Sequence, residues 1–287
     1  MHEPPVDGSP STRAAIPRIA VLVLGCLLPV YDRCIRTIRA TWGARAAENV
    51  DVFYVYGGQP VAGVGLVDLE ALIGTTRPHL DDGEVWSSGD IILCGAADVI
   101  EGQPNCILRK RLIAFEYLAR QRAYDFVYTV CATSYVDLEG LRRYASGLQP
   151  RGVYQGPLSV HGPTGYPFVS GASMLLSRDV ASDLGAHTGA ILARYPDALP
   201  DDVAIGHWVA TRHCREPLDE LCRRLIADQR VTDNQAFVEP NGRKMMDYVE
   251  APAFSHVRHE LSFHYHFHSR RLWDMENFHR RFFARAS

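Results

Sequence analysis

Two adjacent carboxylates, Asp201 and Asp202, follow Pro200 in this 287-residue chain and are of a type that could do acid–base chemistry. Their position also suits the start of a helix. There an aspartate accepts hydrogen bonds from free backbone amides and its charge opposes the helix dipole. The two residues by themselves favour this capping role over a chemical one.

Three histidines, His264, His266 and His268, alternate with other residues near the end of the chain. Alternation in a strand places all three on one face. Imidazoles arranged in this way could hold zinc or a similar metal, or stay protonated and bind phosphate. A polar face of ordinary hydrogen-bonded histidines is the commoner arrangement, and both interpretations stay open.

Cationic residues form a further group of candidates. Arg36 and Arg39 belong to the first expected helix, and Arg109 and Lys110 belong to a later one. Guanidinium and ammonium groups could together neutralise the charge of a bound phosphate group. Most surface arginines have no such role, and the Arg109–Lys110 position is the better candidate.

A buried-looking strand ends in Cys131, Ala132 and Thr133, which supply no carboxylate. Thr133 and Ser134 can donate hydrogen bonds to phosphate oxygens, although neutral donors do not replace the charge of a metal ion. The alternative is that this strand end simply packs, with Cys131 as a small buried hydrophobic residue.

The elements that must position these residues are read from the hydrophobic pattern. Apolar β-branched runs alternate with amphipathic stretches, which predicts an α/β fold with a mostly parallel central sheet flanked by helices. Strands are expected at 19–24, 52–56, 124–130 and 261–268, and helices at 31–42, around 108–120, at 137–144 and from 201. Residues 152–165 are expected to form a Gly/Pro-punctuated loop that lines a pocket. Trp42 is expected in the core.

Composition and charge narrow the class of protein. Hydrophobic residues make up 47% and charged residues 22%, so the chain is globular, and we expect a flexible tail at 1–17 and a single domain at 18–287. A net charge of −3 argues against nucleic acid or an anionic membrane surface as the main partner.

The cysteines and the apolar runs bear on location. Seven cysteines without Cys-x-x-Cys spacing favour a reducing compartment. No apolar run is long enough to span a bilayer, and the polar start reads as a tail rather than a signal peptide. We therefore expect a cytoplasmic protein, and the sequence does not indicate its oligomeric state.

Three segments carry a family resemblance. They are RTIRATWG at 36–43, FVSGASMLLSRDVA at 168–181 and LPDDVAIG at 199–206. In this order they resemble segments of the β-1,3-galactosyltransferase and Fringe superfamily, and the resemblance runs from about residue 18 to the His-rich strand, apart from 219–253. It implies a GT-A-like nucleotide-sugar-binding fold. The implied reaction is an inverting transfer of a hexose or N-acetylhexosamine from a UDP-sugar to a hydroxyl of a small molecule or glycan.

The resemblance also implies roles for residues. An inverting transfer needs one enzymic base, and the family pattern gives that role to Asp202, with Asp201 in reserve. The acceptor is expected at Ser170, Gly171 and Ala172, although Gly171 could equally be a turn residue, as could Asp90 among the donor contacts. The donor-binding residues are expected to be Arg39, Asp90, Arg109, Lys110, Thr133, Ser134 and His266.

The metal site departs from the family pattern, in which the strand matching 124–130 ends in aspartates that bracket a divalent cation. No cofactor is firmly implied here, and if a metal binds, its candidate ligands are His264, His266 and His268. The preferred interpretation is a transferase without an aspartate-held metal. The alternative is a catalytically inactive relative that binds a nucleotide, glycan or protein partner, and a His-metal enzyme of different chemistry is the third class.

Overall fold

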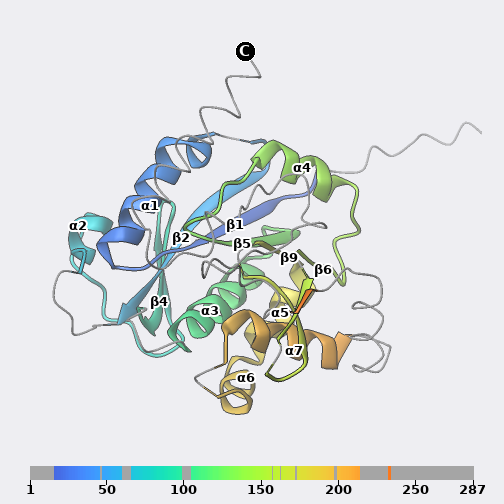
Figure 1. Ribbon diagram of the computed structural model, residues 1–287. Helices are drawn as coiled ribbons and strands as arrows, with labels where there is room; N and C mark the ends of the chain where they lie inside the picture. Colours follow the sequence, from blue (N-terminus) through green and yellow to red (C-terminus); the bar gives the residue numbers. More distant parts are fainter. Residues whose placement is uncertain are drawn as a thin grey trace, which may run out of the picture.

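The computed structural model is an α/β arrangement in which helices cover both faces of a seven-stranded sheet (Figure 1). It describes residues 16–45, 47–59, 66–98, 105–156, 158–161, 163–171, 173–196, 199–213 and 232–233. The helices are α1 (Pro29–Ala40), a 3₁₀ turn η1 (Trp42–Ala44), α2 (Leu69–Ile73), α3 (Asn105–Gln121), α4 (Leu138–Ser146), α5 (Arg178–Ala186), α6 (Thr188–Arg194) and α7 (Asp201–His213). The strands are β1 (Ile19–Leu24), β2 (Val50–Gln59), β3 (Val85–Ser88), β4 (Ile91–Ala97), β5 (Phe126–Cys131), β6 (Tyr154–Gln155), β7 (Leu158–His161), β8 (Tyr166–Val169), β9 (Ser173–Ser177) and β10 (Thr232–Asp233).

The main sheet has the strand order β3-β4-β2-β1-β5-β9-β6. Its four central strands, β4, β2, β1 and β5, are parallel, whereas β3, β9 and β6 pair antiparallel at the two sides. The predicted α/β class is therefore confirmed, and the sheet is mixed, with a parallel centre. The carboxyl ends of the central strands meet at one edge, and that edge includes Cys131 and the residues that follow β1, β2 and β4.

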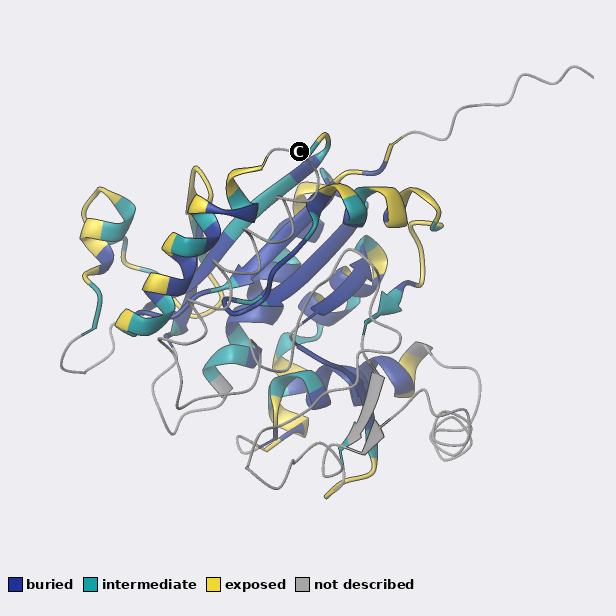
Figure 2. Ribbon diagram, turned by 45° about the horizontal axis from the view of Figure 1, so that its top comes forward, coloured by how far each residue is buried: buried dark blue, intermediate teal, exposed yellow. Residues whose placement is uncertain are grey.

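Both faces of β1 are buried, which explains its uninterrupted apolar sequence. Ile19, Val21 and Val23 pack with residues of α1 and α4 on one face. Ala20 and Leu22 pack with residues of α3, α5, α6 and α7 on the other face. Figure 2 shows the buried strands between these two helical layers.

Several local predictions are confirmed. β1 has the expected bounds, α1 lies within two residues of its expected range, and α7 begins at Asp201 as expected. Trp42 is 1% exposed, and its indole N–H also donates to the backbone oxygen of Ser134 at 3.1 Å. The expected strand at 261–268 and most of the tail at 1–17 lie outside the described residues.

The predicted loop at 152–165 is wrong, because this stretch contains β6 and β7. β6 pairs with β9, and β7 pairs with β8 in a second sheet of order β10-β7-β8. Glycines and prolines mark turns locally, but they do not reveal pairing with strands that come later in the chain.

Helix α7 packs directly on β8. At Gly206 of α7, an added Cβ would lie 2.4 Å from the Cα of Phe168 and 2.6 Å from the oxygen of Pro167. Only glycine permits this approach of helix to strand. The contact lies one helical turn after Asp202, on the same helix. Among the described helices, none combines the length and apolarity needed to cross a bilayer.

Candidate active site

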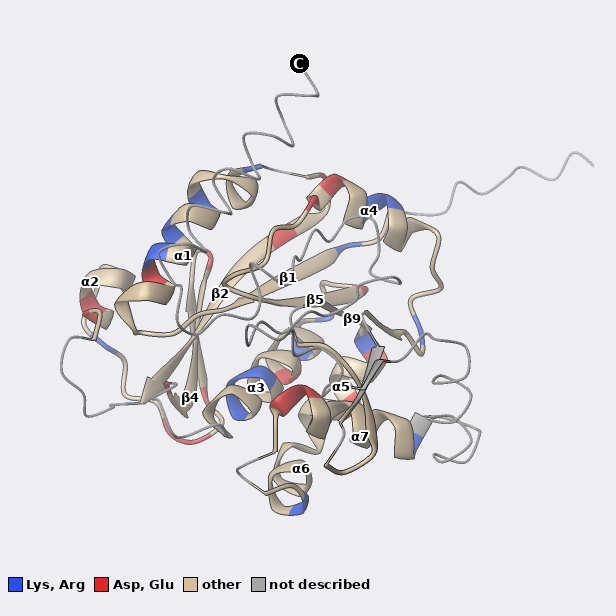
Figure 3. Ribbon diagram, in the orientation of Figure 1, with Lys and Arg blue, Asp and Glu red and all other residues tan. Residues whose placement is uncertain are grey.

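Three consecutive cations on α3, Arg109, Lys110 and Arg111, point in three directions. Successive residues of a helix are separated by about 100° around its axis, so three neighbours cannot share one partner. Each has its own carboxylate: Asp82 for Arg109, Asp98 for Lys110 and Asp201 for Arg111. Figure 3 shows the basic part of α3 beside the acidic start of α7.

Lys110 lies in the interior at the carboxyl edge of the sheet. Its side chain is 1% exposed and its Nζ donates to Oδ1 of Asp98 at 2.5 Å and to the oxygen of Gly25 at 2.9 Å. Asp98 is equally buried and accepts hydrogen bonds from the backbone amides of Leu27 and Gly57. This placement does not fit the predicted donor-binding role of Lys110, because its charge is compensated inside the molecule.

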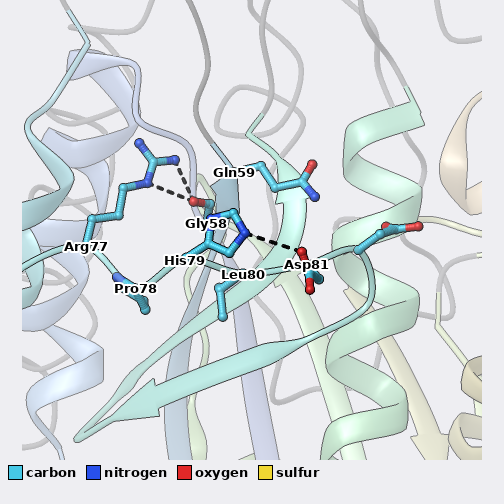
Figure 4. Close-up of a pocket in the computed structure, with 8 residues that line it drawn as sticks. Gly58, Gln59, Arg77, Pro78, His79, Leu80 and Asp81 are labelled. Atoms are coloured by element: carbon cyan, nitrogen blue, oxygen red, sulfur yellow. Dashed lines mark hydrogen bonds and ion pairs between the residues drawn. The ribbon is translucent and has the colours of Figure 1, made fainter.

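Arg109 is on the surface, with its side chain 38% exposed, and it forms an ion pair with Asp82. Asp82 also lines an open pocket of about 480 Å³ beyond the end of β2. Figure 4 shows this pocket, in which Arg77 donates through Nε and Nη2 to the oxygen of Gly58, at 2.8 and 2.5 Å, and His79 contacts Asp81. The pocket is lined by Gly58, Gln59 and residues 77–82, and Asp202 is not among these residues.

Arg111 is the buried member of the three, with 1% of its side chain exposed. Its Nη1 lies 2.7 Å from Oδ2 of Asp201, and its Nη2 donates a long hydrogen bond of 3.4 Å to the oxygen of Gly171. Within the described residues, Nη1 has no aligned hydrogen-bond partner, so its contact with Asp201 is one of charge. A Cβ on residue 171 would lie 2.9 Å from Nη1, so a larger residue there would displace the guanidinium of Arg111.

Asp202 accepts hydrogen bonds from two backbone amides. Its Oδ2 accepts from the amide of Gly171 and its Oδ1 from the amide of Val203, both at 2.9 Å. Two sequence segments that were singled out separately, 168–181 and 199–206, therefore meet at one hydrogen bond. The contact with Val203 retains part of the predicted capping role. We call Arg111, Gly171, Asp201 and Asp202 the Asp202 cluster.

The pKa of Asp202 is raised from its usual value near 3.8 to about 6. Burial is the largest cause and the neighbouring charge of Asp201 is the second. The amide of Gly171, the charge of Arg111 and the amide of Val203 act in the opposite direction. The Asp202 residue is half-buried, so solvent can still reach it. A carboxylate of this kind is mostly ionised at pH 7 and binds a proton more readily than an ordinary aspartate.

The strand end at Cys131 lies next to this cluster. The thiol of Cys131 donates to the oxygen of Gly171 at 3.5 Å. The next three residues, Ala132, Thr133 and Ser134, are at most 3% exposed, and a turn closes with the amide of Ser134 donating to the oxygen of Cys131. Thr133 and Ser134, both predicted to bind the donor, are therefore packed inside the protein.

Arg39 and Asp90 pair with each other at 2.7 Å, and the guanidinium of Arg39 lies over the ring of Tyr54. Asp90 precedes β4, at the amino end of that strand, whereas Cys131 lies at the carboxyl end of β5. The structure therefore places these two predicted donor-binding residues together, apart from the Asp202 cluster.

Of the remaining predicted site residues, the structure describes Ser170 alone. Ser170 is 4% exposed, and its backbone oxygen accepts from the amide of Ser173 in a tight turn. Ala172 and the three histidines, His264, His266 and His268, lie outside the described residues.

The residues at the end of β5 do not fit the divalent cation that the family resemblance implies. A hard cation needs oxygen ligands, usually carboxylates, and Cys131, Ala132 and Thr133 provide none and fold into a buried turn. Among the described residues, no group of three or more His, Cys, Asp or Glu side chains is arranged to hold a metal.

Sequence reasoning missed Arg111, which contacts the cluster directly. The sequence does contain a signal, because the residues three and four positions before and after Arg111 are apolar: Ile107, Leu108, Ala114 and Phe115. A charged residue on an apolar face of a helix requires a buried partner. The pattern could not reveal that the partner is Asp201.

Comparison with known proteins adds no family assignment: no protein-family model and no curated protein matches this chain. Function is therefore inferred from the three segments and from the geometry of the Asp202 cluster.

Proposed function

We propose that this protein is an inverting glycosyltransferase that moves a hexose or N-acetylhexosamine from a UDP-sugar to a hydroxyl of a small molecule or glycan, with Asp202 as the base. The observation that supports the proposal best is the hydrogen bond between Asp202 and the amide of Gly171. It joins the segment expected to bind the acceptor to the segment expected to carry the base. The pKa of that base is raised by burial and by the neighbouring charge of Asp201. The GT-A type of the fold is part of this proposal.

In the proposed reaction the acceptor hydroxyl approaches Asp202 within hydrogen-bond distance. Its oxygen attacks the anomeric carbon as the bond from that carbon to the diphosphate breaks, and its proton passes to the carboxylate of Asp202. The products are the glycoside with inverted configuration and UDP, and the proton leaves Asp202 to solvent. No step is assigned to a metal, because the residues at the end of β5 do not fit one.

The first prediction is that Asp202→Asn lowers transfer by about 100-fold or more, the usual contribution of a positioned base. The amide keeps the shape of the side chain but cannot take the proton. The measurement is release of UDP and formation of glycoside from a panel of UDP-hexoses and UDP-N-acetylhexosamines, with EDTA present. Glu139→Gln, an exposed carboxylate on α4 paired with Arg142, is the matched control and should keep full activity. Unchanged transfer in Asp202→Asn would remove the base assignment.

A second candidate is an inactive relative that binds a nucleotide, glycan or protein partner. The observation that favours it is the buried turn at Cys131–Ser134, where a metal-dependent transferase would need carboxylates. Titration calorimetry with UDP and UDP-sugars separates the two candidates. Binding without turnover in any buffer, with any acceptor or metal, would favour the second, whereas turnover that is lost in Asp202→Asn would favour the first.

A further inference from the structure

We propose that Arg111 is a positioning residue for Asp202, which holds the Gly171 peptide in place and pairs with Asp201 so that Asp202 is the carboxylate that receives the proton. The inference rests on the proposed function, since it concerns the base of that reaction. It adds a residue that none of the three family-like segments contains.

The geometric part concerns the Gly171 peptide. Its oxygen accepts from Nη2 of Arg111 at 3.4 Å and from the thiol of Cys131 at 3.5 Å. On the other side of the residue, its amide donates to Oδ2 of Asp202 at 2.9 Å. The guanidinium and the carboxylate thus hold the same residue from two sides, and a shift of Arg111 changes the direction in which Asp202 points.

The electrostatic part concerns the adjacent carboxylates. Asp201 and Asp202 carry two negative charges against the single buried guanidinium of Arg111, whose Nη1 contacts Asp201 and not Asp202. The cation therefore contacts Asp201 directly, whereas the hydrogen bonds that Asp202 accepts come from the neutral backbone amides of Gly171 and Val203. With less direct compensation for its charge, Asp202 is the carboxylate of the pair to which the proposal assigns the proton.

Within the part of the chain that the structure describes, the groups around Asp202 come from several elements. They are Asp201 and the amide of Val203 on the same helix, Arg111 from α3, the Gly171 peptide from the turn before β9, the thiol of Cys131 behind that peptide, and the phenol of Tyr154 in β6. The charges of Asp202 and Asp201 help to raise the pKa of Tyr154, after burial, and the phenol stays neutral at physiological pH. Arg111 is the single cation among these groups.

The test compares two variants of Arg111. Arg111→Met keeps an extended side chain without its charge, whereas Arg111→Lys keeps the charge without the planar guanidinium group that contacts both Asp201 and Gly171. Carboxyl ¹³C NMR of aspartate-labelled protein reports the titration of Asp202, with the signal identified by its loss in Asp202→Asn. In Arg111→Met the titration midpoint should rise by about one pH unit or more, because a compensating charge is removed. The acidic limb of the pH profile of kcat/KM should move upward by the same amount, with little change in the KM for the UDP-sugar.

Arg111→Lys should keep the midpoint close to that of the wild type and still lose about threefold or more in kcat, because the Gly171 peptide is no longer held. Arg120→Met, at an exposed position of the same helix, is the matched control and should change neither quantity. An unmoved midpoint in Arg111→Met would overturn the proposal even if activity falls. If Arg111→Met does not fold, a wild-type kcat in Arg111→Lys would overturn it.

The two readouts separate this inference from the proposed function. The NMR titration needs no substrate, so a shifted midpoint in a protein with no transferase activity would reject the function and retain the role of Arg111. Transfer activity that depends on Asp202 but has the same pH profile with and without Arg111 would retain the function and reject the inference.

Discussion

Asp201 and Asp202 are identical side chains at adjacent positions, and their surroundings give them different properties. Asp201 faces the guanidinium of Arg111, whereas Asp202 faces the amides of Gly171 and Val203. A full positive charge stabilises an ionised carboxylate more strongly than backbone amides do. Asp202 is in addition half-buried and lies next to the like charge of Asp201, and both effects disfavour its ionised form. A difference in environment between two neighbouring carboxylates is a recurrent way of assigning acid–base roles at neutral pH.

The pH dependence of transfer follows from the raised pKa of Asp202. The base must be ionised to act, so kcat/KM should increase with pH, with a midpoint near 6, and reach a plateau above pH 7. The measurement is kcat/KM between pH 4.5 and 8.5, intervals of about half a unit being enough to locate one ionisation. Activity that decreases as the pH rises from about 5 to 7 would contradict a basic role for Asp202.

At the scale of elements, α3 explains why a run of cations is a poor guide to an anion site. Arg109, Lys110 and Arg111 are consecutive in sequence, but the helix directs them toward the pocket rim, the sheet edge and α7. The three carboxylate partners come from three different elements or loops. Adjacent charges in a helix therefore stabilise separate parts of the fold instead of forming one cationic surface.

The packing of α7 on β8 makes a prediction about the position of the base. Gly206→Ala places a Cβ 2.4 Å from the Cα of Phe168, a backbone atom that cannot move alone. The helix must shift away from β8, which we expect to lower the free energy of unfolding by about 1–3 kcal/mol. Transfer should fall as well, because Asp202 lies one turn earlier on the same helix. Denaturant unfolding and the transfer assay measure the two effects.

Gly189→Ala is the matched control for that substitution. Gly189 lies in α6, and no atom lies within 4 Å of the position of its added Cβ. Alanine is the better helix former by about 0.5–1 kcal/mol, so this variant should be slightly more stable and fully active. Equal stability of Gly206→Ala and the wild type would show that α7 is not held by the contact with β8.

At the scale of the whole molecule, the sequence predicted what depends on local pattern. The apolar run of β1 and the amphipathic faces of α1 and α3 were found because residue spacing along one element reveals which sides are buried. β6 and β7 were missed because their partners, β9 and β8, come later in the chain, and the sequence between them contains turn residues.

The same distinction applies to the candidate site. Asp202 was found through its segment, but the resemblance alone cannot reveal that Gly171 donates to it or that Arg111 contacts Asp201. The sequence predicts Lys110 at a phosphate together with its neighbour Arg109. Its partner Asp98, 12 residues earlier, binds it in the interior, and only the three-dimensional arrangement reveals that.

The Asp98–Lys110 pair connects the ends of several elements and gives a prediction for global stability. Asp98 follows β4, accepts from the amides of Leu27 after β1 and Gly57 in β2, and pairs with α3 through Lys110. Lys110→Met leaves a buried carboxylate without its cation, so the free energy of unfolding should fall by about 3–5 kcal/mol.

A second substitution tests whether the unpaired charge is the cause of that loss. Adding Asp98→Asn to Lys110→Met removes the charge while the amide oxygen can still accept from Leu27 or Gly57, so part of the stability should return. Arg120→Met, which breaks an exposed pair on the same helix, should have little effect on unfolding by urea. If the double variant is no more stable than Lys110→Met, the ammonium group contributes through its contact with Gly25 and its packing rather than through the charge of Asp98. The carboxyl edge of the sheet would then be stabilised mainly by the apolar packing on its two faces.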